Sequence, residues 1–105
     1  MKLSIIIPVF NEEKTITQII KKVLAVKLSL RKEIIVVDDG STDHSKSQIK
    51  KFKIKLISYD KNLGKGAAVR TGLNNATGDI IIIQDGDLEY DPSYYPVLLK
   101  SILEN

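Results

Sequence analysis

Two carboxylates separated by a single glycine follow the most apolar run of the sequence. Residues 80–83 are four consecutive isoleucines, and Asp85-Gly86-Asp87 comes shortly after them. Alternate residues of an extended segment point the same way, so the two carboxylates could face one point, while Gly86 would let a ligand approach the backbone. Close carboxylates repel each other unless a positive charge lies between them. The spacing favours a divalent metal ion carrying a phosphate ligand, although a polar loop that ends a strand is the alternative for the pair alone.

Composition limits the classes of protein to be considered. The chain has 105 residues, of which 43% are hydrophobic and 28% charged, so we expect one globular domain over residues 1–105. It has no cysteine, which excludes disulfides and thiolate metal sites, and His44 is its one histidine, which excludes a histidine-based triad or zinc site. No apolar run could cross a bilayer and no signal peptide is evident, so we expect a cytoplasmic protein.

The basic charge of the chain, +3 overall, does not indicate a nucleic-acid partner. Its lysines fall at helical spacing opposite apolar faces, and few aromatic residues lie between them to stack on bases. We therefore expect a solvated helix surface and no nucleic acid.

Strands and helices are expected to alternate along the chain. The expected strands cover residues 3–9, 33–37, 54–59 and 80–83, the last buried on both faces and the third half exposed. The expected helices start after Asn11 as N-cap, with an apolar stripe from Ile16 to Leu24, and then cover residues 43–52, 67–76 and a segment that begins near Pro96.

This rhythm predicts an α/β fold, a Rossmann-like parallel sheet of about four strands in the order 3-2-1-4 with helices on both faces. Ligands of such sheets bind beyond the carboxyl ends of the strands, where the strand order reverses. Residues 10–12, 38–39 and 85–87 follow three of the expected strands and carry acids or amides. We expect them to meet in one crevice.

Two other phosphate-binding patterns are not supported. The chain lacks the G-x-x-x-x-G-K-[ST] pattern of a P-loop, and Gly64-Lys65-Gly66 follows the wrong strand for a dinucleotide-binding fingerprint. A nucleotidyltransferase, which would also use metal and phosphate, would normally have a glycine-rich basic loop after the first strand; residues 9–13, Val-Phe-Asn-Glu-Glu, are neither.

Four segments together resemble the family-2 glycosyltransferases of the GT-A fold. They are IIIPVFNE at residues 5–12, IVVDDGSTD at 35–43, NLGKG at 62–66 and QDGDLE at 84–89. The run DGDLEYDP at residues 85–92 is most similar to the polyprenyl-phosphate sugar synthases, the enzymes of the dolichol-phosphate mannose or glucose synthase type. The four motifs occur in the family's order and cover nearly the whole chain.

The resemblance implies roles for individual residues. It implies that the nucleotide is bound by Pro8, Phe10, Glu12, Val37, Asp39, Asp85, Gly86 and Asp87. It implies a metal, Mg²⁺ or Mn²⁺, held by Asp85 and Asp87, with Glu89 as a third ligand. Asp38 is expected to be structural and to hold backbone amides of its loop. Lys65 and Arg70 are candidate neighbours of the phosphates, with solvated positions as the alternative for both.

The resemblance also implies an activity, that of a hexosyltransferase which takes a sugar from a UDP- or GDP-linked donor and transfers it to a polyprenyl phosphate or a glycan. Residues 1–105 correspond to the nucleotide-sugar-binding half, so we expect the acceptor half and the general base beyond Asn105, and donor binding without transfer by this part alone. The full-length protein is expected at the cytoplasmic face of a membrane. The edge of the last strand, exposed in this part, is expected to favour a homo-oligomer. The alternatives are a non-catalytic nucleotide-binding or interaction module and a nucleotidyltransferase.

Overall fold

The chain forms a single sheet with helices on both faces, as the alternating pattern predicts. The computed structural model describes residues 1–86 and 91–104, with side chains described up to residue 100. The elements in chain order are β1 (Lys2–Val9), α1 (Ile16–Ala25), β2 (Arg31–Asp38), α2 (Ser45–Ile49), β3 (Lys55–Ser58), α3 (Lys65–Asn75), β4 (Ile80–Ile83), a 3₁₀ turn (Pro92–Tyr94) and α4 (Tyr95–Glu104). Among these described helices, none is long and apolar enough to cross a membrane.

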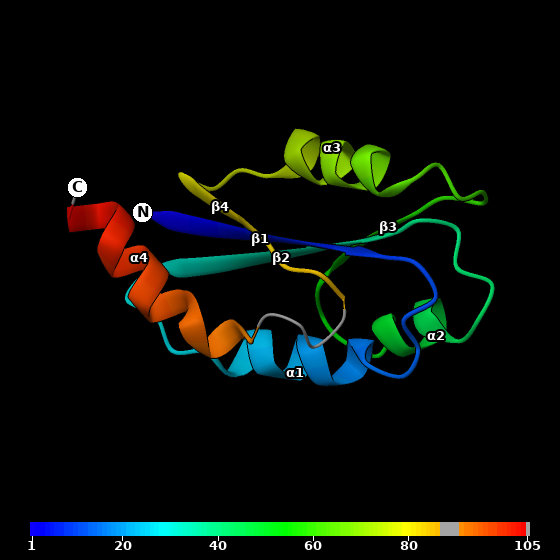
Figure 1. The fold of residues 1–105 in the computed structure, drawn as a ribbon, viewed down its shortest axis with the longest axis horizontal. Coiled ribbons are helices and arrows are strands. Elements are labelled where there is room, and N and C mark those ends of the chain that lie inside the picture. Colours follow the sequence, from blue (N-terminus) through cyan, green and yellow to red (C-terminus); the bar gives the residue numbers. More distant parts are fainter. Residues whose placement is uncertain (87–90, 105) are drawn as a thin grey trace.

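The four strands are parallel and lie in the order β3-β2-β1-β4. This confirms the predicted fold class and strand order. The first strand is central because it pairs with β2 on one side, Ile5 opposite Ile34, and with β4 on the other, Ile5 opposite Ile82. Helix α3 covers one face of the sheet, and α1, α2 and α4 lie on the other side (Figure 1).

The larger core lies between the sheet and α1. Alternate residues of β1 point into it, and the buried side chains of α1 recur at helical spacing. These are Leu3, Ile5, Ile7 and Val9 from the strand and Ile16, Ile19, Ile20 and Val23 from the helix. The predicted stripe is confirmed except at Leu24, which is exposed.

Helix α3 lies unusually close to the opposite face of the sheet. A Cβ built at Gly72 would lie 2.4 Å from Cγ2 of Ile6, so only glycine permits this approach. Ala68 packs on the same face against Ile35 and Val37. The small residues of α3 thus bring its first turn down to the carboxyl ends of β1 and β2.

The prediction that residues 80–83 are buried on both faces is wrong. Ile80 and Ile82 pack against the larger core, but Ile81 is 41% and Ile83 47% exposed. The reason is that β4 is an edge strand, and α3 contacts β1 and β2 instead. Among the described residues no strand covers the outer edge of β4. Association through this edge stays a prediction.

The segment between β1 and α1 also differs from expectation. The N-cap of α1 is Thr15 rather than Asn11, and Asn11 has a positive φ of 51°. The Asn11 Oδ1 accepts a hydrogen bond from the Thr42 backbone N–H at 2.8 Å, and the Glu12 N–H donates to Ser45 Oγ at 2.8 Å. These bonds tie the segment to the loop after β2 and to the first residue of α2, which explains why α1 starts later than predicted. Helix α2 is shorter than the predicted 43–52.

Candidate functional site

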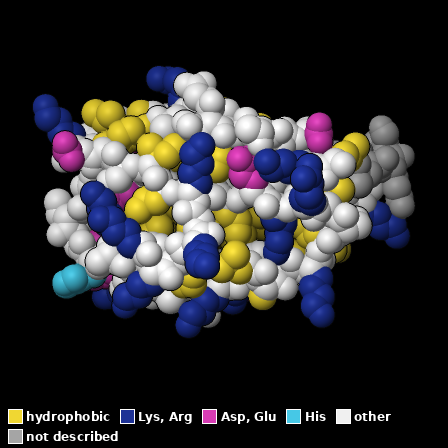
Figure 2. Space-filling view, turned by 180° about the vertical axis from the view of Figure 1, so that it is seen from behind, with side chains coloured by type: hydrophobic (Ala, Val, Ile, Leu, Met, Phe, Trp, Pro, Cys, Tyr) yellow, Lys and Arg dark blue, Asp and Glu magenta, His cyan; other side chains and the backbone are white. Residues whose placement is uncertain are grey.

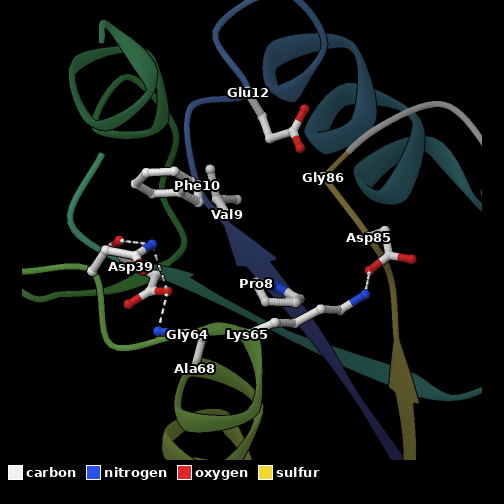
Figure 3. Close-up of a pocket in the computed structure, with 11 residues that line it drawn as sticks. Pro8, Val9, Phe10, Glu12, Asp39, Gly64, Lys65, Ala68, Asp85 and Gly86 are labelled. Atoms are coloured by element: carbon white, nitrogen blue, oxygen red, sulfur yellow. Dashed lines mark hydrogen bonds and ion pairs between the residues drawn. The ribbon is translucent and has the colours of Figure 1, made fainter. Parts of the chain in front are cut away.

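A pocket of about 500 Å³ opens at the carboxyl ends of β1, β2 and β4, beside the first turn of α3 (Figure 3). Its lining comes from segments far apart in the sequence. The lining residues are Pro8, Val9, Phe10, Glu12, Asp39, Asn62, Gly64, Lys65, Ala68, Asp85 and Gly86. The predicted crevice therefore exists, and six of the eight residues expected at the nucleotide line it. Asp87 and Glu89 lie outside the described residues.

Asp39 anchors the loop that leads into α3. Its side chain is buried, and its carboxylate accepts hydrogen bonds from the backbone N–H groups of Leu63 at 2.7 Å and Gly64 at 2.9 Å. The side-chain amide of Asn62 donates to the same carboxylate at 3.2 Å. Gly64 has a φ of 101°, a conformation that favours glycine. Asp39 thus lines the pocket itself and also holds the loop that forms one of its walls.

The neighbouring carboxylate, that of Asp38, makes different contacts from those predicted. Asp38 was expected to hold backbone amides, but Asp39 does so. Asp38 is 1% exposed, and the hydroxyl of Ser58 donates to its Oδ2 at 3.4 Å. Val37 is buried in the core beside Ala68 and does not line the pocket, so its contact with a nucleotide stays a prediction.

Gly86 is held tightly against the end of the first strand. Its carbonyl accepts a hydrogen bond from the hydroxyl of Thr15, the N-cap of α1, at 2.7 Å. A Cβ at Gly86 would lie 3.3 Å from both Glu12 Cγ and Val9 Cγ2, closer than side chains normally approach. Glycine at this position therefore lets the segment after β4 pack on the segment after β1.

Lys65 and Asp85 form an ion pair across the pocket. The lysine is the first residue of α3, and the aspartate follows β4. The lysine side chain is 64% exposed and that of the aspartate 27% exposed. Arg70, the other candidate neighbour of the phosphates, is exposed and does not line the pocket.

The chemistry of Asp85 fits a divalent cation. Its carboxylate supplies the hard oxygen ligands that Mg²⁺ and Mn²⁺ take, and it already pairs with a cation, the Lys65 ammonium. Within residues 1–86 and 91–100, no group of three or more acidic, histidine or cysteine side chains is placed to hold a metal. The role of Asp85 as a metal ligand stays a prediction.

A buried hydrogen bond, not expected from the sequence, supports the segment that carries Asp85. The Tyr95 hydroxyl donates to Gln84 Oε1 at 2.7 Å, and both side chains are 2% exposed. The Gln84 amide also donates to the backbone oxygen of Asp85 at 3.3 Å. Burial raises the pKa of Tyr95, which keeps its hydroxyl a donor. The sequence signal was an amide placed directly after an apolar strand.

The segment that leads into α4 is fixed by a carboxylate. Asp91 accepts a hydrogen bond from the Ser93 N–H at 2.9 Å and pairs with Lys22 of α1 at 2.9 Å. The backbone hydrogen bond from Ser93 and then the Lys22 side chain lower the pKa of Asp91 to about 2. The charge of Asp91 therefore links α1 to the start of α4.

Basic side chains are distributed over one face of the molecule (Figure 2). Figure 2 shows Lys and Arg spread across the face opposite to that of Figure 1, with apolar side chains between them. The positive charge of this face is not gathered in one strip.

Comparison with known proteins identifies related sequences. The sequence profile of the family described as Glycosyl transferase family 2 matches residues 4–105. The chain is 33% identical to the dodecaprenyl-phosphate galacturonate synthase of Rhizobium johnstonii over 110 residues, which cover 97% of this chain and 32% of the relative. It is 33% identical to the dolichol-phosphate mannosyltransferase of Pyrococcus furiosus over 106 residues, which cover 97% of this chain and 30% of that relative.

Solved structures show the same fold. Glucosyl-3-phosphoglycerate synthase from Mycobacterium tuberculosis in complex with UDP has a TM-score of 0.84 at 30% identity, over 99% of this chain and 40% of that one. The same synthase with Mn²⁺, UDP and glucosyl-3-phosphoglycerate has a TM-score of 0.82 at 30% identity, over 97% of this chain and 39% of that one. Residues 1–105 span about a third of the length of the curated relatives. Since the family profile covers almost all of the sequence, the chain belongs to glycosyl transferase family 2.

Proposed function

We propose that residues 1–105 form the nucleotide-sugar-binding half of a glycosyltransferase. In this proposal the chain binds a UDP- or GDP-linked sugar together with a divalent metal ion. The whole protein then transfers the sugar to an acceptor bound by residues beyond this half. The observation that carries the proposal is the convergence of Pro8, Phe10, Glu12, Asp39, Asp85 and Gly86 on one pocket.

The shape and chemistry of this pocket suit a nucleoside diphosphate. Phe10 is 44% exposed at the pocket, where an aromatic ring can stack on a base, and the carboxylate of Asp39 can accept hydrogen bonds. The first turn of α3 lies at the same pocket, and helix N-termini favour phosphate groups. The UDP in the similar structure from M. tuberculosis supports this assignment.

The proposed metal ligands are Asp85 together with Asp87 and Glu89. Bound there, Mg²⁺ or Mn²⁺ would act as a Lewis acid that offsets the charge developing on the leaving diphosphate. The Mn²⁺ in a similar structure supports a divalent ion. The residues of this chain contribute the orientation: the Gln84 side chain donates to the backbone oxygen of Asp85, and the Thr15 hydroxyl donates to that of Gly86.

The acceptor is proposed to be a polyprenyl phosphate. The names of the two curated relatives, a dodecaprenyl-phosphate galacturonate synthase and a dolichol-phosphate mannosyltransferase, support this choice over a glycan. Such an acceptor would bring the whole protein to the cytoplasmic face of a membrane. The general base is proposed to lie beyond Asn105.

Calorimetric titration of the chain with UDP and with GDP tests the proposal. Each titration is made with Mn²⁺, with Mg²⁺ and with a chelator. We expect one of the nucleotides to bind more tightly with metal than with chelator, and Asp85→Asn to reduce that difference. Asp60→Asn removes the same charge from an exposed position that does not line the pocket, and it should bind like the wild type. Binding of neither nucleotide under any condition would contradict the proposal and favour a non-catalytic module.

A further inference from the structure

Lys65 reaches across the pocket from one side to the other. Figure 3 shows its side chain extending past Pro8 to Asp85, with the amino group toward the carboxylate. The lysine belongs to α3 and the aspartate follows β4, so the two meet only because the sheet brings both elements to one edge. The ammonium thus lies at the carboxylate that fits a divalent cation.

The backbone of Lys65 is fixed, but its side chain can move. Asp39 holds the two preceding residues, Leu63 and Gly64, through their N–H groups at 2.7 Å and 2.9 Å. The side chain itself is 64% exposed, so it can leave Asp85 without disturbing the core. A fixed base and an exposed, flexible stem let one ammonium reach more than one partner within the pocket.

Two cations cannot both be close to Asp85 without repelling each other. A divalent ion at this carboxylate carries twice the charge of the ammonium, so the two compete for the same oxygens. A diphosphate at the first turn of α3 would offer the ammonium a more negative partner, in a position that helix N-termini favour for anions. The diphosphate would then pair with the Lys65 ammonium, and the metal with the Asp85 carboxylate.

Building on the function proposed above, we propose that Lys65 couples diphosphate binding to metal binding. Lys65 competes with the metal for Asp85, and a bound diphosphate draws the ammonium away and leaves the carboxylate to the metal. Lys65 is thus a positioning residue whose effect is a cooperativity between two ligands. No covalent step is involved.

Measurement of four dissociation constants in the wild type and in Lys65→Met tests this coupling. They are those of Mn²⁺ alone, of UDP with chelator, and of each ligand in the presence of the other; GDP replaces UDP if GDP is the nucleotide that binds. An exposed ion pair contributes up to about fivefold in an equilibrium constant, so Mn²⁺ alone should bind about two- to fivefold more tightly to the variant. UDP with chelator should bind about fivefold or more weakly to it, because a charge-assisted contact is lost. The factor by which UDP strengthens Mn²⁺ binding should fall in the variant; chelation of Mn²⁺ by UDP in solution is the same in both proteins and cancels.

Three controls separate coupling from general effects. Lys21→Met removes the same charge from an exposed position of α1 outside the pocket and should leave all four constants unchanged. Lys65→Arg keeps the charge and should retain the coupling. Uridine or guanosine, which has no phosphate, should bind equally to the wild type and to Lys65→Met.

The results distinguish this inference from the proposed function. A wild type that binds nucleotide with metal, together with a Lys65→Met variant of identical constants, would overturn the coupling and leave the proposed function standing. A wild type that binds neither nucleotide contradicts the proposed function and overturns the coupling with it. Weaker binding of Mn²⁺ alone to Lys65→Met would also overturn the competition for Asp85.

Discussion

Replacing Asp39 with asparagine removes one of the two oxygens that hold the loop before α3. In the wild type, Oδ1 accepts from the Leu63 N–H at 2.7 Å, and Oδ2 accepts from the Gly64 N–H at 2.9 Å. In the variant an NH₂ group must face one of these donors, whichever way the amide turns. The variant therefore loses at least one hydrogen bond to a charged acceptor and gains a contact between two donors.

The magnitude follows from the number and exposure of these bonds. A lost hydrogen bond to a charged group costs about 1.5–3 kcal/mol, and exposure of Leu63 to water reduces this to about 1–2 kcal/mol. For a domain of this size, 1 kcal/mol corresponds to about 4–8 °C, so the melting temperature should fall by about 5–15 °C. Urea unfolding followed by circular dichroism measures the same loss as a lower midpoint at unchanged slope.

The matched control is Asp60→Asn, which removes the same charge from an exposed residue of the same loop. Its free energy of unfolding should stay within about 0.5 kcal/mol of the wild type, as for most surface changes. If Asp39→Asn were no less stable than Asp60→Asn, Asp39 would not anchor this loop. The explanation that Asp39 fixes the backbone of Lys65 would then be refuted.

Three further predictions concern packing, a buried hydrogen bond and pH. Gly72→Ala should destabilise the protein by about 1–2 kcal/mol in urea unfolding, because its methyl group would overlap a side chain of β1 and the better helix propensity of alanine restores only part of the loss. The control Gly66→Ala, whose Cβ would have no atom within 4 Å, should stabilise the protein by up to about 1 kcal/mol. Equal effects of the two substitutions would contradict the close packing of α3. Tyr95→Phe should lower stability by about 1 kcal/mol because a buried amide oxygen loses its donor, while Tyr94→Phe, at a 64% exposed residue, should change little in the same assay. The pKa of Asp91 is lowered from 3.8 to about 2, so its stabilising effect is fully present above about pH 4 and is lost as the pH falls through about 2; the difference in unfolding free energy between wild type and Asp91→Asn should shrink over this interval, and a difference independent of pH would contradict the assignment.

Much of the architecture could be predicted because apolar periodicity is a local property. The stripe on α1 and the buried run in β1 required only the spacing of isoleucine and valine. The exposure of Ile81 and Ile83 was not predicted, because it depends on which strands α3 covers. A run of four isoleucines has the same pattern in a central strand and in an edge strand.

The residues that line the pocket were predicted better than the hydrogen bonds and ion pairs between them. The place of Asp39 as loop anchor was assigned to Asp38, because two adjacent carboxylates after a strand cannot be told apart without the backbone direction. The pairing of Lys65 with Asp85 was not predicted either. It depends on the close approach of α3 to the sheet. Gly72 permits this approach, but a glycine in a helix does not by itself predict it.

The central place of β1 has a consequence for how the protein matures during synthesis. Of the four strands, β1 is synthesised first and β2 can pair with it early, but its other neighbour, β4, is the last of the four to be made, with Leu3 opposite Ile80. Until then one edge of β1 waits unpaired, and contacts so distant in sequence form slowly. The pocket needs the residues after β4, so it is completed by the final pairing step. A complete pocket therefore marks the assembly of the whole four-stranded sheet, and a nascent chain that ends before β4 would carry most of the core but an incomplete pocket.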